Sequence, residues 1–164
     1  MRTLVPALGI AVTLGYGAAI AWLYATQPRT LAEIHTGAQV ATGTYAVDEP
    51  RFQSGLELFR REQFGPARAE WARADPARRD ARVQFYVAYA FYREGWGRLH
   101  HDDGLYRQGL EAVDRVQALG APALRVDDPQ LGLRTPAELR AELEDGVRKT
   151  WSDFNPLRVL EVRK

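Results

Sequence analysis

The chain of 164 residues contains no cysteine, and this absence excludes disulfides, thiolate metal sites and cysteine nucleophiles. The absence of cysteine does not indicate whether the protein is in an oxidising or a reducing compartment. An excess of one charge is also missing, because 22 basic residues stand against 21 acidic ones. Without Arg2 the remaining residues are neutral apart from their histidines, so we expect no nucleic-acid partner.

Lysine is scarce, with Lys149 and Lys164 as the only two against twenty arginines. Together with abundant alanine and glycine, this usage is typical of a GC-rich bacterial genome, an association rather than a physical argument. Residues 51–98 carry ten arginines and six acids. Because the acids are interspersed, this mild bias favours a solvated helix face over a nucleic-acid surface.

Charge is absent from Thr3 to Pro28, where apolar and small residues continue without a break. About 20 such residues cross the core of a bilayer. The sequence therefore predicts a transmembrane helix over residues 1–28 that contacts lipid through residues 3–25. Trp22 and Tyr24 suit the headgroup zone.

A cleaved secretory signal is the alternative, since Arg2 opens the chain and Ala19-Ile20-Ala21 fits a cleavage site. We favour a retained anchor. Arg2 lies on one side of the segment, and Arg29 followed by Glu33 on the other, which favours a cytoplasmic N-terminus. The expected location is the bacterial inner membrane, with one crossing and a periplasmic C-terminal domain.

Small residues within this segment indicate close packing against another helix. Gly9, Gly17 and Ala21 follow one another at steps of eight and four residues, so they share one helix face. We take these three residues as candidate contacts with a partner.

The rest of the chain predicts a small all-α domain, beginning after a stalk over residues 29–47. Thr30 to Glu33 matches a capping box for a short helix through Val40. Asp48 and Pro50 then favour a helix start. The many aromatic residues of this domain predict a hydrophobic core, because each buried ring removes a large apolar area from water.

Breaks and caps divide this domain into five helices, with the first three over about 51–62, 67–74 and 81–94. The fourth carries an apolar stripe from Tyr106 to Val116 before Gly120, and the fifth runs from Thr135 to about Trp151. Gly65-Pro66 is expected to end the first, and Asp75-Pro76 the second. Asp102 or Asp103 can cap the fourth, and Thr135 with Glu138 forms a capping box for the fifth. We divide the domain into a helical part over 48–122 and a C-terminal loop, capping helix and tail over 123–164.

Within residues 51–76, small and large side chains recur in a fixed order: Gly55, Leu58, Phe59, Phe64, Ala67, Trp71 and Ala74. This order resembles the tetratricopeptide repeat (TPR), a helix pair of 34 residues. A second unit starts near Gln84, with Gly109, Val113 and Val116 in its second helix after an insertion of about nine residues. The resemblance implies a TPR-like fold and protein binding, with Trp71 and Tyr89 buried. Two units need flanking support, which Leu139, Leu143 and Val147 can supply.

No catalytic, metal or cofactor site emerges. The most site-like cluster is His100-His101-Asp102-Asp103, but neighbours in sequence point apart on a helix and ligand spacing is absent. A loop and helix cap is therefore the better interpretation. Asp127-Asp128 lacks the further oxygen ligands of a calcium loop and is predicted to be a turn.

Trp96 lies between two glycines at a helix end, where we expect it to be too exposed for the core. An exposed tryptophan often anchors an interface, so Trp96 joins the candidate partner contacts.

The sequence thus favours a non-enzymatic, membrane-anchored interaction module that binds other membrane protein subunits. The expected role is an accessory subunit that stabilises a larger membrane complex of respiratory or photosynthetic type. The alternative is a freestanding periplasmic scaffold or chaperone for envelope assembly, which would bind extended peptides in a groove. An enzyme or metal protein using His100, His101 and Asp103 is the hypothesis from a different class.

Overall fold

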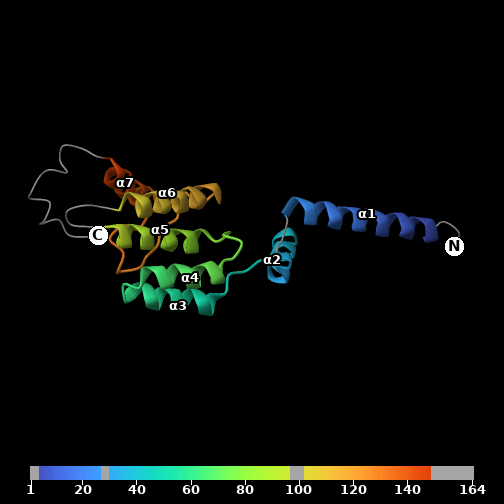
Figure 1. Cartoon of the computed structure of the whole chain (residues 1–164), viewed down its shortest axis with the longest axis horizontal. Coiled ribbons are helices and arrows are strands. Elements are labelled where there is room, and N and C mark those ends of the chain that lie inside the picture. Colours follow the sequence, from blue (N-terminus) through green and yellow to red (C-terminus); the bar gives the residue numbers. More distant parts are fainter. Residues whose placement is uncertain (1–3, 27–29, 97–101, 149–164) are drawn as a thin grey trace, which may run out of the picture. The chain divides into compact units, whose positions relative to one another are not determined.

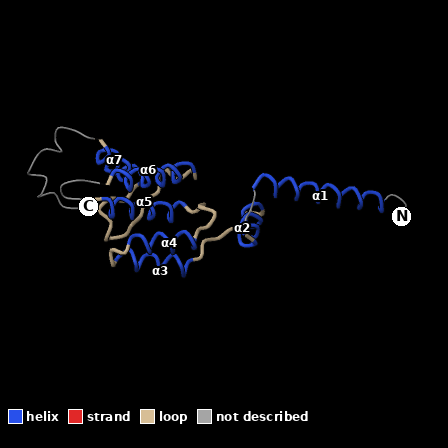
Figure 2. Tube along the Cα trace, in the orientation of Figure 1, coloured by secondary structure: helices blue, strands red, loops and turns tan. Residues whose placement is uncertain are grey.

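A computed structural model describes residues 4–26, 30–96 and 102–148 of the chain. Within these ranges every regular element is an α-helix, and none is a strand (Figure 2). The predicted all-α class is therefore confirmed. The chain divides into two compact units, Met1–Tyr45 and Ala46–Lys164.

The first unit contains α1 (Leu4–Thr26) and α2 (Leu31–Ala41). Both start where the sequence predicts a helix. The Trp22 ring lies against Gly37 of α2, where an added Cβ would come within 2.5 Å of the ring. Trp22 thus packs on the neighbouring helix of its unit.

The helix predicted near the N-terminus is present as α1. The prediction that this helix spans a membrane is a separate one. Among the residues that the structure describes, no helix is both long and apolar enough to cross a membrane.

In its described residues, the second unit is a stack of five helices (Figure 1). In chain order they are α3 (Glu49–Arg60), α4 (Phe64–Ala74), α5 (Ala81–Gly95), α6 (Asp103–Ala118) and α7 (Pro136–Val147). Each helix packs against the next one along the chain, and α7 also touches α5. Nine residues of α5 are buried, so α5 is the central helix. The sequence predicts this position, because apolar residues occur on most sides of this helix.

Side-chain caps set four of these helix starts. Asp48 accepts a hydrogen bond from the Arg51 amide, and Asp80 accepts one from the Val83 amide. Asp102, not Asp103, caps α6 through the amides of Gly104 and Leu105. Thr135 and Glu138 form the predicted reciprocal capping box. The Glu138 pKa is lowered, first because its carboxylate accepts a hydrogen bond from the Arg134 amide.

The prediction that Gly65-Pro66 ends a helix is wrong. Both residues lie in the first turn of α4, where proline is tolerated because the amide it lacks would have no helical partner. The chain reverses earlier, at Glu62, whose φ of 60° is left-handed.

The last helix is shorter than predicted. It ends at Val147, with Arg148 as its C-cap, and the expected continuation to Trp151 lies outside the described residues. Residues of the predicted C-terminal part, 123–164, belong to the same unit as α3 to α6. Leu139 and Leu143 of α7 are fully buried in the common core.

The core is dominated by aromatic rings, and it confirms that Trp71 and Tyr89 are buried, each with no exposed surface. Phe59 of α3 meets Trp71, Tyr86 and Tyr89 at centroid distances of 5.9 to 6.2 Å. These rings connect α3, α4 and α5, and such contacts add to the stabilisation from burial.

Close contact between α3 and α4 depends on Gly55. A Cβ atom at this position would lie 2.3 Å from Nε1 of Trp71, inside the contact distance of any carbon and nitrogen. The same Nε1 donates a hydrogen bond of 3.2 Å to the Phe52 carbonyl. Glycine therefore admits the indole ring and lets it bond to the α3 backbone.

We expect Gly55→Ala to lower the free energy of unfolding by about 1 to 3 kcal/mol, because the added methyl group overpacks the core. This cost exceeds the gain of roughly 1 kcal/mol that alanine brings to a helix interior. Urea unfolding followed by circular dichroism measures the change.

Ser54→Ala, on the exposed side of the same helix, is the control and should change stability by less than about 0.5 kcal/mol. The penalty of Gly55→Ala should shrink when Trp71→Phe removes the pyrrole ring. Equal penalties in the two backgrounds would contradict the contact.

Candidate interaction surfaces

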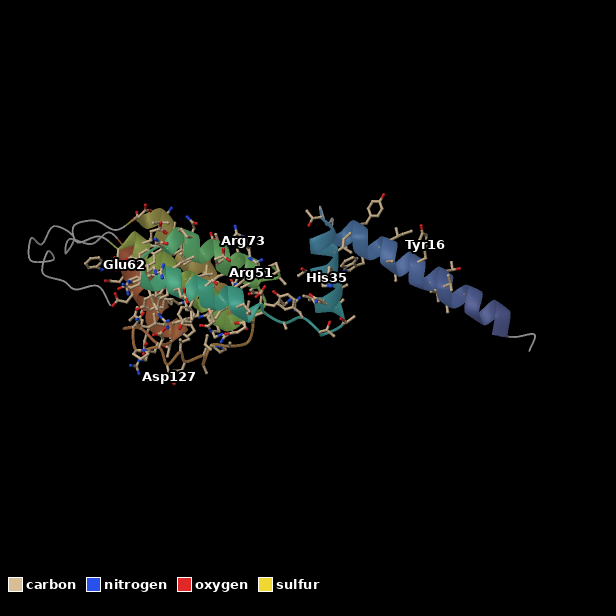
Figure 3. The ribbon with its side chains drawn as sticks, turned by 90° about the horizontal axis from the view of Figure 1, so that it is seen from below. Tyr16, His35, Arg51, Glu62, Arg73 and Asp127 are labelled. Atoms are coloured by element: carbon tan, nitrogen blue, oxygen red, sulfur yellow. The ribbon has the colours of Figure 1, made fainter. Side chains whose placement is uncertain are left out.

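The described side chains of α1 are exposed except for Trp22, which is half-buried against α2. Val12, Leu14 and Tyr16 expose 66 to 71% of their area, and Tyr24 exposes 79%. The Tyr16 side chain is labelled on α1 in Figure 3. A Cβ atom added at Gly9 or Gly17 would meet nothing within 4 Å, and Ala21 is exposed. The three predicted partner contacts thus lie on a helix with a free surface.

Trp96 differs from its prediction. It is half-buried and packs against the core as the C-cap of α5, where its amide donates to the Tyr92 carbonyl. The flanking glycine Gly95 is itself buried against Tyr106, because a Cβ there would lie 2.8 Å from that ring. Gly95 therefore reflects close packing here, Gly97 lies outside the described residues, and Trp96 is in part a structural residue.

The candidate metal cluster is only partly described, since His100 and His101 lie outside the described residues. The Asp102 carboxylate already accepts hydrogen bonds from backbone amides as the N-cap of α6. His35, the other histidine, is exposed on α2 in the first unit. Among the described residues, no group of three potential ligands could hold a metal ion.

Asp128 has a role that the sequence did not reveal. It accepts a hydrogen bond of 3.0 Å from the Tyr86 hydroxyl, while the Tyr89 hydroxyl accepts the amides of Gly132 and Leu133 at 3.0 and 3.4 Å. Two tyrosines of α5 thus hold the segment 121–135, which we call the crossing segment. Its Val126, Leu131 and Leu133 are buried in the core.

The crossing segment is bonded to α5 at the hydroxyl groups of Tyr86 and Tyr89. The rings of both tyrosines also contact Phe59 of α3, so this face of α5 is occupied by the chain itself. The sequence identifies the two tyrosines only as core residues, because the hydrogen-bond partners of their hydroxyl groups lie more than 40 positions away.

Another face of the second unit is hollowed. A cavity of about 320 Å³ lies among α4, α5, α6 and the turn between α4 and α5. Trp71, Val87 and Phe91 contribute apolar surface to it, Arg68, Arg78 and Arg115 contribute positive charge, and Asp75 and Glu111 contribute negative charge. We call it the arginine hollow.

The three arginines of the hollow differ in how far they are neutralised. Arg68 forms an ion pair with Glu94, and its guanidinium lies 4.1 Å from the centre of the Phe91 ring. Arg115 donates from Nε to the amide oxygen of Gln84 at 3.0 Å. Neither Arg115 nor Arg78 forms an ion pair with a described carboxylate. Burial lowers the pKa of Arg115, the charge of Arg78 lowers it further, and Glu111 opposes both effects.

Asp75 also borders the hollow but is fully buried and already engaged. Its carboxylate accepts the amides of Arg79 and Asp80 and the side-chain amide of Gln84. These bonds stabilise the turn in which Arg78 adopts a left-handed φ of 53°. A non-glycine residue with a left-handed φ raises the free energy of the folded state, so the contacts of this turn must offset the cost of the Arg78 backbone conformation.

Sequence reasoning assigned the arginines of residues 51–98 to a solvated face, and several do lie there in ion pairs. Arg51 and Arg73, for example, both pair with Glu70 on the surface of α3 and α4 (Figure 3). The hollow was missed because Arg78 and Arg115 are 37 positions apart and belong to different elements. Only the turn signal at Asp75-Pro76 marked its border.

Comparison of the chain with protein-family models, with curated proteins and with solved structures gave no match in any of the three.

We expect Tyr89→Phe to lower the free energy of unfolding by about 1 to 3 kcal/mol, because it leaves the part-buried Gly132 amide and the buried Leu133 amide without their acceptor. Hydrogen exchange at Gly132 and Leu133 should accelerate most. Tyr86→Phe, which removes one bond to the half-buried Asp128, should cost less. Unchanged exchange at Gly132 in the Tyr89 variant would show that the hydroxyl does not hold the crossing segment.

The Tyr86 pKa is raised, mainly by burial and further by the hydrogen bond and charge of Asp128. The folded state therefore retains a proton that the unfolded state loses near pH 10. The stabilisation is complete below that pH and is lost as the pH rises toward the folded-state pKa. Urea melts from pH 8 to 11 should show a steeper loss for the wild type than for Tyr86→Phe, and equal slopes would contradict the assignment.

Proposed function

We propose that the protein is a non-enzymatic interaction module, attached through α1 to a larger membrane protein complex that it stabilises as an accessory subunit. The observation that carries the proposal is the contrast between its two units. The second unit buries its large apolar side chains, whereas α1 exposes Ile10, Val12, Leu14 and Ile20.

Such a helix needs an apolar environment, because an exposed apolar surface of this extent in water favours association. No charged residue interrupts α1. Lipid beside other membrane helices supplies that environment, and in lipid the association of helices depends on close backbone packing. The face formed by Gly9, Gly17 and Ala21 is suited to such packing, since nothing covers its two glycines.

The second unit contributes a helical scaffold whose contacts support the resemblance to TPR hairpins. Gly55 receives the Trp71 ring, and Ala67 and Ala74 are buried at the same α3–α4 interface. In the second hairpin Gly109 lies against Leu143 and Phe91. A TPR-like unit implies protein binding, and a bacterial periplasmic location of this unit belongs to the proposal.

A freestanding scaffold is the weaker candidate, because the crossing segment occupies one face of α5 that an extended peptide would otherwise use. No described residue favours the enzyme hypothesis, whose His100 and His101 lie outside the described ranges.

We expect Gly17→Leu to reduce co-purification of the complex from natural membranes by about tenfold, since the larger side chain prevents close helix approach. Gly15→Leu is the matched control, because Gly15 lies on the opposite side of α1, two residues from Gly17. It should co-purify as the wild type does. Quantitative mass spectrometry after mild-detergent extraction measures both.

Equal recovery of partners with all three proteins would contradict attachment through the small-residue face. A wild-type protein that brings down no stoichiometric partner, and that alkaline carbonate removes from membranes, would overturn the proposed function itself.

A further inference from the structure

The first unit contains a corner between its two helices. α1 ends at Thr26 and α2 begins at Leu31, and the helices meet where Trp22 contacts Gly37 without packing along their lengths. We propose that Trp22 holds α2 along the surface of the lipid bilayer that α1 enters. The inference rests on the proposed attachment through α1, and it identifies a second contact between the same unit and lipid.

The depth of Trp22 is the first argument. Trp22 and Tyr24 lie near the C-terminal end of α1, and tryptophan and tyrosine favour the headgroup level of a bilayer. Trp22 is half-buried, and a Cβ atom added at Gly37 would lie 2.5 Å from Cζ2 of its indole ring. Because Gly37 touches a ring at the headgroup level, the middle of α2 lies at that level as well.

The direction of α2 is the second argument. Figure 1 shows α2 running across the direction of α1, and Figure 3 shows the same arrangement from below. A helix that crosses the end of an inserted helix at the headgroup level runs along the bilayer surface. α2 therefore follows this surface, whereas a stalk would rise from it.

The distribution of side chains around α2 is the third argument. Apolar and small residues recur at steps of three and four positions and so share one face of the helix: Ile34, Gly37, Ala38 and Ala41. This face includes the position that contacts Trp22, and its Ala38 and Ala41 are exposed. The polar His35 and Gln39 lie on the other side of α2. The face that α2 turns toward the membrane is thus its apolar one.

α2 alone should bind lipid weakly, because it has 11 residues and no lysine or arginine that would attract anionic headgroups. The contact with Trp22 makes this weak binding intramolecular, since the ring keeps α2 next to the surface. Removal of the ring should therefore release α2 into water while α1 stays inserted.

Nitroxide spin labels measure the depth of single positions, and the chain suits this method because it contains no cysteine. The full chain is placed in phosphatidylcholine nanodiscs with one label at Leu14→Cys, Ala38→Cys, His35→Cys or Ser54→Cys. Leu14 reports on the middle of α1, and Ser54 is an exposed position of α3. Power saturation with oxygen, which enters lipid, and with a water-soluble nickel chelate gives the depth of each label.

We expect the label at Ala38 to lie about 5 to 10 Å into the boundary between headgroups and acyl chains, as the apolar face of a surface helix does. The label at Leu14 should lie deeper. The labels at His35 and Ser54 should be open to the nickel chelate, because both positions face water.

Two variants test the role of the ring. Trp22→Ala should return the label at Ala38 to water, because the contact with α2 is lost. Tyr24→Ala is the matched control, since it removes an aromatic ring from the same end of α1, where Tyr24 exposes 79% of its area. It should leave the depth of the label at Ala38 unchanged.

The inference is overturned if the chelate reaches the label at Ala38 as freely as the one at Ser54. It is also overturned if Trp22→Ala leaves the depth at Ala38 unchanged, or if Tyr24→Ala changes it equally. The label at Leu14 separates this failure from that of the proposed function. A deep label at Leu14 with a water-exposed label at Ala38 refutes the surface position of α2 and leaves the attachment through α1 standing. A label at Leu14 that is open to the chelate refutes the insertion of α1 and both proposals with it.

Discussion

The seating of Trp71 against Gly55 is the contact on which the second unit depends. The indole ring occupies space that any other residue at position 55 would fill, and its Nε1 is satisfied by a backbone carbonyl of α3. From this position the ring meets Phe52, Phe59 and Tyr86, so one side chain of α4 ties α3 to α5. A buried aromatic ring with a satisfied polar atom gives both apolar burial and a defined orientation.

The turn after α4 shows how the same packing creates a surface. Asp75 is fully buried, and a buried carboxylate is tolerated only where hydrogen bonds replace its water. Two amides of the turn and the Gln84 amide supply these bonds, and the resulting geometry places Arg78 beside Arg115. The position of Arg78 at the hollow is thus a consequence of how one buried acid is satisfied.

The two units of the chain differ in how much of their apolar side-chain surface is buried. The second unit hides its apolar side chains between helices and lets the crossing segment cover α5. Among the described side chains of α1, most are exposed, and Trp22 packs on Gly37 of α2. The contrast between these two arrangements is the observation on which the proposed function rests.

The all-α class and most helix starts followed from the sequence alone, because they depend on neighbours within a few positions: an Asp or Thr that caps the next turn, a proline in a first turn, or apolar residues at helical spacing. The burial of Trp71 and Tyr89 was expected from the resemblance to the repeat, and the structure confirms it. Local signals also misled, as when Gly65-Pro66 suggested a break although proline is acceptable in a first turn.

Only the tertiary structure revealed the half-burial of Trp96, the anchoring of the crossing segment by Tyr86 and Tyr89, and the arginine hollow. In each case the decisive partner is remote in sequence or belongs to another element, so no local pattern records it. Whether a glycine marks a flexible end or the close approach of a ring, as at Gly95 and Gly55, is likewise decided by what packs against it. Short-range chemistry therefore determined the helices of this protein, and long-range packing determined which of their side chains remain free to bind.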